Sequence, residues 1–252
     1  MIYTLLLIII VLTINNFYLL RILLTLFMNI TLSKYCNNSA FFTHKEKQEI
    51  FPMSQYIESN YLSIKSDYIN YKPQIKPFFE MLPDFFVGDK EKQIKENKFW
   101  KLLPIKTTGK IIQSNHKFFP SLHPILSNPS IHNVFFSVLD PNVCIPPHYG
   151  PYKGYLRYHL GLIVPEENGK KPFIVVDNQK YFWKEGEGIM FDDFYEHYVE
   201  NPTSQQRVVL FIDVVRPLKG FIDKLNKIGI FLIENDPKLK KIQEIQHKSV
   251  KI

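Results

Sequence analysis

The chain of 252 residues is long enough to bury the core of one large domain, and its 45% hydrophobic content excludes a disordered polymer. Its net charge of +7 favours anionic surfaces, but no nucleic-acid-binding motif accompanies the dispersed basic residues, so we expect no nucleic-acid partner. Two cysteines, Cys36 and Cys144, are too few for a disulfide framework or a cysteine-rich metal site.

Residues 1–32 differ from the rest of the chain because they are almost entirely apolar. No charged side chain occurs before Arg21, and a run of this length suffices to span a bilayer. A cleaved signal peptide would need a basic start and a small-residue cleavage site, and the sequence has neither. We therefore expect a single-pass membrane anchor over 1–32. Basic residues after the first apolar run predict that the bulk of the protein is cytosolic. They are Arg21, Lys34, Lys45 and Lys47.

Three further segments follow the predicted anchor. Residues 33–96 are predicted to form a helical lead-in, because apolar and aromatic residues recur at helical spacing from Tyr56 to Ile69 and Pro73 should end that helix. A β-rich core is expected over 97–218, where short β-branched and aromatic runs alternate with turn residues. The basic, amphipathic residues 219–252 are expected to form a helical tail packed on that core.

Three of the eight histidines have distinctive surroundings. His148 follows two prolines and precedes Gly150, in a rigid turn that can hold a ligand atom at little entropic cost. Arg157 and His159 stand two residues apart in a predicted strand, so both face the side opposite to its leucines. His197 follows an acidic turn whose carboxylates either orient its ring or form an ordinary polar turn. These carboxylates belong to Asp192, Asp193 and Glu196.

Arg207 opens a predicted strand that is otherwise almost entirely apolar. An arginine buried at such a place needs an anion. Asp213 can supply it from within the protein, and a bound carboxylate is the alternative. Two imidazoles suit a borderline metal such as Fe(II), and a guanidinium can form a bidentate pair of hydrogen bonds with a carboxylate. These residue types therefore indicate a metal beside a dicarboxylate cosubstrate.

Two stretches carry a family resemblance. The sequences FFSVLDPNVCIPPHYGPYKGYLRYHLGLIVP (135–165) and WKEGEGIMFDDFYEHYVENPTSQQRVVLFIDVVRP (183–217) closely resemble the aspartyl/asparaginyl β-hydroxylase family. The resemblance extends over roughly 97–218. It implies a mainly β, double-stranded β-helix core of the jelly-roll or cupin type, with flanking helices. It also implies an enzyme, a dioxygenase that uses Fe(II), 2-oxoglutarate and O₂ to hydroxylate a C–H bond.

The resemblance also assigns roles to individual residues. His148 and His197 match the iron ligands, and Arg207 matches the arginine that holds the distal carboxylate of 2-oxoglutarate. The full set that matches cosubstrate contacts is Ser137, Arg157, His159 and Arg207. Most related oxygenases add a carboxylate ligand two residues after the first histidine, where this chain has Gly150. We therefore expect one more water on the iron and weaker metal retention.

The resemblance leaves the substrate open. The aspartyl/asparaginyl hydroxylases proper also resemble this chain in the glycine at position 150, which favours an Asp or Asn side chain of a protein. Bacterial membrane enzymes that hydroxylate lipid A resemble it in the apolar N-terminus and in WKEGEG and EHYVEN, which favours a lipid acyl chain. Two non-enzymatic interpretations also stay open. One is a catalytically inactive β-helix membrane protein that binds a ligand or partner, and the other is a structural protein whose basic surface grips anionic lipid.

Overall fold

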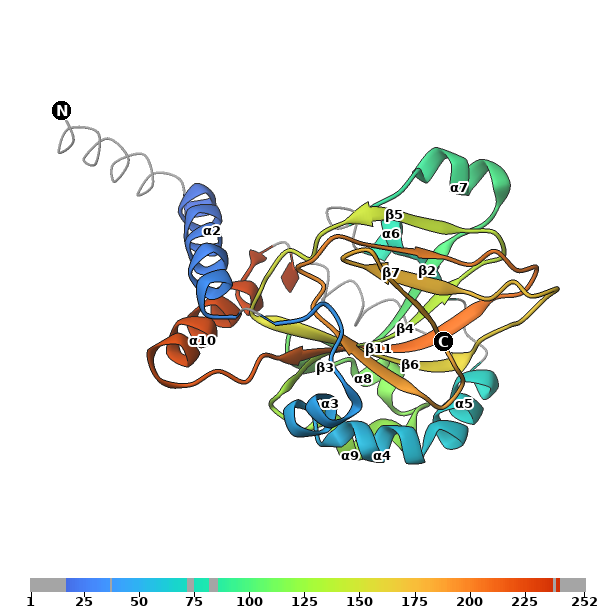
Figure 1. The fold of residues 1–252 in the computed structure, drawn as a ribbon, viewed down its shortest axis with the longest axis horizontal. Coiled ribbons are helices and arrows are strands. Elements are labelled where there is room, and N and C mark those ends of the chain that lie inside the picture. The colour runs from blue at the N-terminus through green and yellow to red at the C-terminus, as the bar shows by residue number, and fades with distance from the viewer. Residues whose placement is uncertain (1–16, 37, 72–74, 82–85, 238, 241–252) are drawn as a thin grey trace.

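The computed structural model describes residues 17–36, 38–71, 75–81, 86–237 and 239–240. Two antiparallel sheets lie face to face, and helices cover the outer face of the larger one (Figure 1). The expectation of a mainly β core with flanking helices is therefore confirmed. Strands that are distant in the sequence lie side by side in both sheets, so the site residues can meet only in the finished fold.

The larger sheet has seven strands in the order β1-β2-β4-β11-β6-β9, with β3 paired to β2. Its strands are β1 (Lys76–Pro77), β2 (Trp100–Thr107), β3 (Lys110–Ile111), β4 (Ile131–Leu139), β6 (Tyr155–Ile163), β9 (Gly188–Phe191) and β11 (Arg207–Val215). The smaller sheet has four strands in the order β5-β10-β7-β8. They are β5 (Cys144–His148), β7 (Phe173–Val176), β8 (Gln179–Phe182) and β10 (His197–Glu200).

Helices precede, interrupt and follow the strands. They are α2 (Phe17–Tyr35), α3 (His44–Ile50), α4 (Met53–Ser59), α5 (Tyr61–Asn70), α6 (Phe78–Met81), α7 (Lys90–Glu96), α8 (Gln113–His116), η2 (Pro120–Leu122), α9 (His123–Leu126) and α10 (Gly220–Glu234). The single helix predicted from Tyr56 to Ile69 is divided at Asn60. Its side-chain amide donates to the carbonyl of Tyr56 at 2.8 Å, which competes with regular helical bonding. Pro73, predicted to end this helix, lies outside the described residues.

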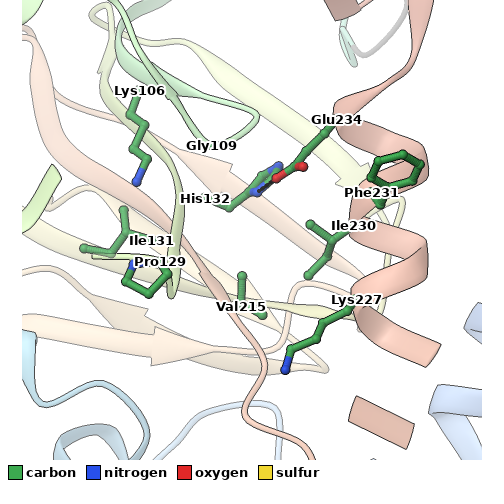
Figure 2. Close-up of a pocket in the computed structure, with 10 residues that line it drawn as sticks. All are labelled: Lys106, Gly109, Pro129, Ile131, His132, Val215, Lys227, Ile230, Phe231 and Glu234. Carbon is green, nitrogen blue, oxygen red and sulfur yellow. Dashed lines mark ion pairs between the residues drawn. The ribbon is translucent and has the colours of Figure 1, made fainter. Parts of the chain in front are cut away.

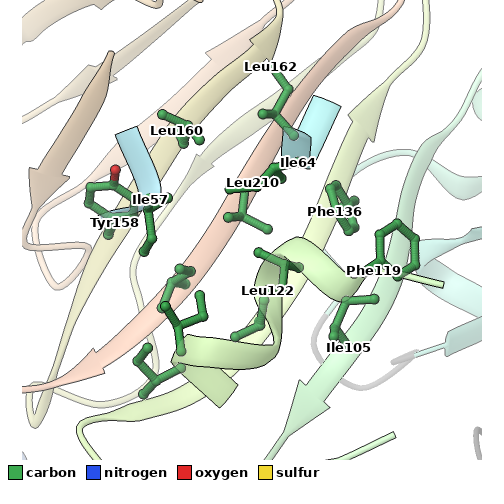
Figure 3. Packing of buried hydrophobic residues seen from close by; sticks show 14 of the residues in the cluster. Ile57, Ile64, Ile105, Phe119, Leu122, Phe136, Tyr158, Leu160, Leu162 and Leu210 are labelled. Atoms are coloured by element: carbon green, nitrogen blue, oxygen red, sulfur yellow. The ribbon is translucent and has the colours of Figure 1, made fainter. Parts of the chain in front are cut away.

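Alternation along the strands of the larger sheet divides the apolar side chains into two layers. On β4, β6 and β11, Phe136, Tyr158 and Leu210 point outward and pack against the covering helices (Figure 3). Ile57 of α4 and Leu122 of η2 complete this layer from the helical side. The opposite face of the same strands looks toward the smaller sheet. A second apolar cluster fills the space between the sheets, and its members include Leu139, Ile145, Val176, Trp183, Phe191 and Val209.

The N-terminal part differs from the predicted anchor. Residues 1–16 lie outside the described residues, and in the part of the chain that is described no helix is long and apolar enough to cross a membrane. The described helix therefore gives no support to a membrane span over 1–32. Instead, α2 packs beside α10 at one end of the molecule (Figure 1). Arg21 and Lys47, both expected to flank a span as cytosolic charges, are buried in ion pairs with Asp236 and Glu58.

Candidate active site

The inner face of the larger sheet gathers the polar residues singled out in the sequence. Because alternate side chains of a strand face opposite ways, Arg157 and His159 on β6 point away from the helix-covered layer, as predicted. On β11, Phe211 pairs with His159 and Asp213 pairs with Arg157. Ser137 of β4 stands opposite Val209 of β11. The strand register thus brings residues from three segments onto one inward-facing surface.

The two predicted metal ligands meet on the smaller sheet. His148 at the end of β5 and His197 at the start of β10 are direct cross-strand partners, and their ring centroids lie 4.1 Å apart. The Nδ1 atom of His148 lies 2.8 Å from the carbonyl oxygen of Pro146, and that of His197 lies 3.0 Å from the carbonyl oxygen of Tyr195. Each contact favours the tautomer that carries its proton on Nδ1, which leaves Nε2 as the metal-binding atom.

Both rings are held in the form that binds a metal. Burial lowers the pKa of His197 to about 3, with help from the neighbouring His148. Burial also lowers the pKa of His148 below the ordinary histidine value. Both imidazoles are therefore neutral at pH 7, and neutral imidazole is the species that coordinates metal ions. The buried Nε2 of His197 has no hydrogen-bond partner in the structure, which fits an atom reserved for a ligand.

Asp193 fills the space that a side chain at position 150 would need. A Cβ atom on Gly150 would lie 2.5 Å from Cγ of Asp193, closer than real Cβ contacts allow. The backbone fixes this arrangement, because the amide of Gly150 donates to the carbonyl of Asp193 at 2.7 Å. Burial raises the pKa of Asp193 to about 6, and its carboxylate pairs with Arg157 at 2.9 Å. A carboxylate therefore lies next to the backbone of position 150, although that position carries none.

The donor set can be compared with what an iron ion requires. In the described ranges of the chain, no three His, Cys, Asp or Glu side chains form a group able to hold a metal ion. The histidine pair is therefore treated as a candidate metal-binding element. Two neutral nitrogens of fixed tautomer fit Fe(II), and the remaining positions would be left to cosubstrate, O₂ and water. The residues present therefore fit the metal that the family resemblance implies.

Arg207, at the start of β11, is buried and has only weak partners. Its side chain is 1% exposed, and its Nη1 donates to the carbonyl and the hydroxyl oxygens of Ser137 at 3.3 and 3.5 Å. Its Nε has no partner, and its guanidinium lies 4.8 Å from the ring of Trp183. Burial lowers the pKa of Arg207 to about 9. Asp213, the internal counter-ion considered from the sequence, pairs with Arg157 instead, at 3.1 Å.

The geometry around Arg157 and His159 refines what they can do. Two buried carboxylates, Asp193 and Asp213, already balance the charge of Arg157. Both ring nitrogens of His159 are buried without hydrogen-bond partners in the structure. Its ring lies 5.0 Å from that of Phe191 and 5.2 Å from that of Phe211. Burial, followed by the charges of Arg157 and Arg207, lowers the pKa of His159 well below its ordinary value, so the ring is neutral.

Some of these features have no signal in the sequence. The contact between Gly150 and Asp193 and the two carboxylates on Arg157 depend on strands that meet only in the folded chain. Trp100 was not singled out either, yet its indole Nε1 donates to the Ser137 hydroxyl at 3.0 Å and thereby orients it. An aromatic residue at the start of a strand is too common a pattern to indicate this role.

A separate cavity of about 320 Å³ lies between α10 and strands β2, β4 and β11 (Figure 2). Lys106, His132, Lys227, Phe231 and Glu234 are among the residues that line it. Burial lowers the pKa of His132 to about 4. None of the residues predicted for the metal or cosubstrate lines this cavity, so it is distinct from the candidate active site.

Comparisons with known proteins bear on the family of the chain. The profile of the family described as aspartyl/asparaginyl β-hydroxylase matches residues 58–217. An ornithine lipid ester-linked acyl 2-hydroxylase of Rhizobium tropici is 37% identical over 174 residues, which are 68% of this chain and 59% of that protein. The human aspartyl/asparaginyl β-hydroxylase is 38% identical over 82 residues, which are 32% of this chain and 10% of that protein.

One of the solved structures that match the chain is that of a predicted oxalate decarboxylase from Thermotoga maritima, with 11% identity and a TM-score of 0.32. The match covers 46% of this chain and 80% of that one. The family profile, in contrast, spans more than half of this chain and includes both histidines and Arg207. The chain therefore belongs to the aspartyl/asparaginyl β-hydroxylase family.

Proposed function

We propose that this protein is an Fe(II)- and 2-oxoglutarate-dependent dioxygenase that hydroxylates a C–H bond. One juxtaposition carries the proposal. Two neutral imidazoles, His148 and His197, face each other on one sheet, and the facing sheet buries an arginine, Arg207, with no carboxylate partner among the described residues. A buried guanidinium is costly unless an anion joins it, and a diacid that also reaches the metal would meet that need.

In the proposed reaction, 2-oxoglutarate and O₂ give succinate and CO₂, and one oxygen atom enters the substrate as hydroxyl. Bound iron supplies the activation of O₂, which no side chain of the protein can perform. The protein binds and orients the reactants. Arg207 and Ser137 bind the distal carboxylate of 2-oxoglutarate, while the rings of Trp183, Phe191 and Phe211 exclude water from the space between the sheets.

For the substrate, we favour a lipid acyl chain over an Asp or Asn side chain. The relative named as an acyl 2-hydroxylase matches 68% of this chain, whereas the human protein hydroxylase matches 32% at similar identity. The glycine at position 150 does not decide between them, because the steric reason for it is the neighbouring Asp193. Attachment to a membrane through residues 1–32, with the catalytic domain in the cytosol, is part of the same proposal and is consistent with a lipid substrate.

Turnover can be measured directly as succinate release from 2-oxoglutarate by the full-length protein with added Fe(II). We expect His197→Ala to abolish the release, since it removes one of two metal ligands. Arg207→Met should raise the 2-oxoglutarate concentration for half-maximal rate by about tenfold or more, because a charge-assisted bond to a buried carboxylate is lost. His44→Ala, which removes an exposed histidine at the start of α3, is the matched control and should be silent.

A binding measurement separates the enzyme from an inactive descendant of the fold. Addition of 2-oxoglutarate with a redox-inert divalent metal should raise the melting temperature of the wild type but not of Arg207→Met. Ligand-induced stabilisation without succinate release under Fe(II) and O₂ would favour a binding protein. Identical turnover in the wild type, His197→Ala and Arg207→Met would remove the assignment altogether.

The substrate class is testable in cells. Lipid extracts from cells that express the wild type should contain acyl chains with one added oxygen atom, and extracts from cells expressing His197→Ala should not. Peptides from the same cells provide the contrasting readout. Oxygen added to Asp or Asn residues, with unmodified lipids, would overturn the preference for a lipid.

A further inference from the structure

Exposed apolar side chains concentrate on two neighbouring helices. On α2 they occur at spacings of one, four and five residues, which places them on one face of the helix. On α10 they recur three and seven residues apart. We call this set the apolar platform. It consists of Ile22, Leu23, Leu26, Phe27 and Ile30 on α2, with Phe221, Ile228 and Phe231 on α10. Most of the exposed large apolar side chains of the described residues belong to it.

The charge nearest to this platform on α2 is hidden. Arg21 is 8% exposed and turns toward the C-terminal end of α10, where it donates to the carbonyl of Leu232 and pairs with Asp236. Carbonyl groups at a helix C-terminus attract cations, so this placement is favourable. With Arg21 withdrawn between the helices, the exposed face from Ile22 to Ile30 presents no charged side chain to its surroundings.

Both helices also form hydrogen bonds to the loop that follows His148. Asn29 of α2 donates to the carbonyl of Pro151 and accepts from the amide of Lys153, each at 3.0 Å. Asn226 of α10 donates to the carbonyl of Gly154 at 3.1 Å and accepts from the Tyr152 hydroxyl at 2.9 Å. The loop runs directly from His148 to β6, so the platform is attached to the edge of the candidate active site.

We propose that the apolar platform docks on the surface of an anionic phospholipid membrane, with α2 and α10 lying in its interfacial layer. Large exposed apolar faces mark interaction sites, and two observations select a lipid as the partner. The sixteen residues that precede α2 in the sequence contain no charged residue, and such a composition favours an apolar phase over water. Lysines outnumber acidic residues from Lys219 to the C-terminus, which suits anionic headgroups.

Docking in this way would bring the candidate active site close to the membrane. The grip of Asn29 and Asn226 on the loop after His148 would hold the histidine pair near the lipid layer, where acyl chains are supplied. This consequence rests on the proposed hydroxylase function. The docking of α10 needs neither residues 1–32 nor iron and 2-oxoglutarate, so docking and turnover can fail separately.

Tryptophan substitutions in the full-length chain report the position of each helix. Phe27→Trp probes α2, and Phe231→Trp probes α10, where the native side chains are 58% and 60% exposed. Phe182→Trp on β8, where the phenylalanine is 45% exposed, is the matched control. We expect vesicles of phosphatidylcholine and phosphatidylglycerol with brominated acyl chains to quench both helix probes severalfold more than the control.

A second measurement tests affinity and charge. The double variant Ile228→Ser, Phe231→Ser should partition onto these vesicles about tenfold more weakly, because two apolar side chains no longer leave water. Binding to pure phosphatidylcholine should be weaker than to the mixed vesicles, and high salt should reduce the difference. Circular dichroism checks that the variant is folded.

Two outcomes would overturn the proposal. If the Phe231→Trp probe is quenched no more than the Phe182→Trp control, α10 does not lie in the lipid layer, even where residues 1–16 hold the protein on the vesicle. If sedimentation shows a stable dimer and neither helix probe responds to brominated lipid, the platform binds a second copy instead. Succinate release measured in parallel shows whether the proposed function stands or falls independently.

Discussion

At position 150 a side chain is missing for a steric reason. The carboxylate of Asp193 occupies the place where a Cβ atom would stand, and its partner Arg157 is itself held by Asp213. A ligand carboxylate attached at 150 would have to displace this group. Asp193 belongs to the turn before His197, and its backbone carbonyl accepts from the amide of Gly150.

Replacement of Gly150 by alanine should disturb the site even though alanine is small. The added methyl group must push Asp193 away from Arg157, so we expect weaker binding of Fe(II) and a loss of about 1–3 kcal/mol in the free energy of unfolding. Calorimetric metal titration and urea denaturation measure the two effects. In the double variant Gly150→Ala, Asp193→Ala the clash is absent. The loss in the free energy of unfolding should therefore be smaller in the double variant than the sum of the losses in the two single variants. Strict additivity would contradict the steric explanation.

Among the elements, α10 packs against the loop after His148 through a glycine. A Cβ atom on Gly229 would lie 2.6 Å from Cζ of Tyr152, so the helix approaches the loop after His148 more closely than any other residue would permit. The sequence predicts a helical tail packed on the core, and its amphipathic pattern is clear. The partner of that helix is not predictable, because α2 and the loop come from distant parts of the chain.

We expect Gly229→Ala to destabilise the protein, although alanine favours a helix by about 1 kcal/mol relative to glycine. The clash with the Tyr152 ring should outweigh that gain and lower the melting temperature. Addition of Tyr152→Leu, which removes the end of the ring, should recover part of the loss relative to Gly229→Ala alone. A higher melting temperature for Gly229→Ala would show that α10 does not pack on the loop in this way.

Over the whole molecule, buried neutral histidines make the stability depend on pH. His132 lies under α10 with a pKa lowered to about 4, whereas an unfolded chain has an ordinary histidine pKa of about 6.5. Between these values the unfolded state binds more protons than the folded state. Stability due to His132 is therefore present above about pH 6.5 and is lost as the pH falls toward 4. His197, with a pKa of about 3, acts in the same direction.

Urea denaturation at pH 7 and pH 5 should reveal this dependence. We expect a loss on the order of 2 kcal/mol from His132 alone at pH 5, in addition to the losses from the other buried histidines. The variant His132→Phe keeps a ring of similar shape without a titrating group, so its stability should fall less between the two pH values. An equal fall in the variant and the wild type would contradict the buried, neutral state of His132.

The sequence predicts features that depend on neighbouring residues better than features that depend on residues far apart in the chain. Alternation within one strand correctly placed Arg157 and His159 on the face opposite to the leucines, since that rule needs only neighbouring residues. The division of α4 from α5 escaped notice because the apolar spacing does not mark Asn60, whose side-chain amide donates to the carbonyl of Tyr56. The pairing of His148 with His197 follows from the register of β5 on β10, which is set by tertiary packing, and it was implied by family resemblance alone.

Two main-chain oxygens, those of Pro146 and Tyr195, decide in advance how the imidazoles of the active site are turned. Rings fixed in this way need little rearrangement to accept any divalent ion of suitable size. A pair of nitrogens binds copper, nickel and zinc more tightly than ferrous iron. Under the proposed chemistry, Fe(II) would therefore occupy the site only where the cell keeps the free concentrations of competing metals low. Traces of copper or nickel in a preparation would displace iron and inhibit the enzyme.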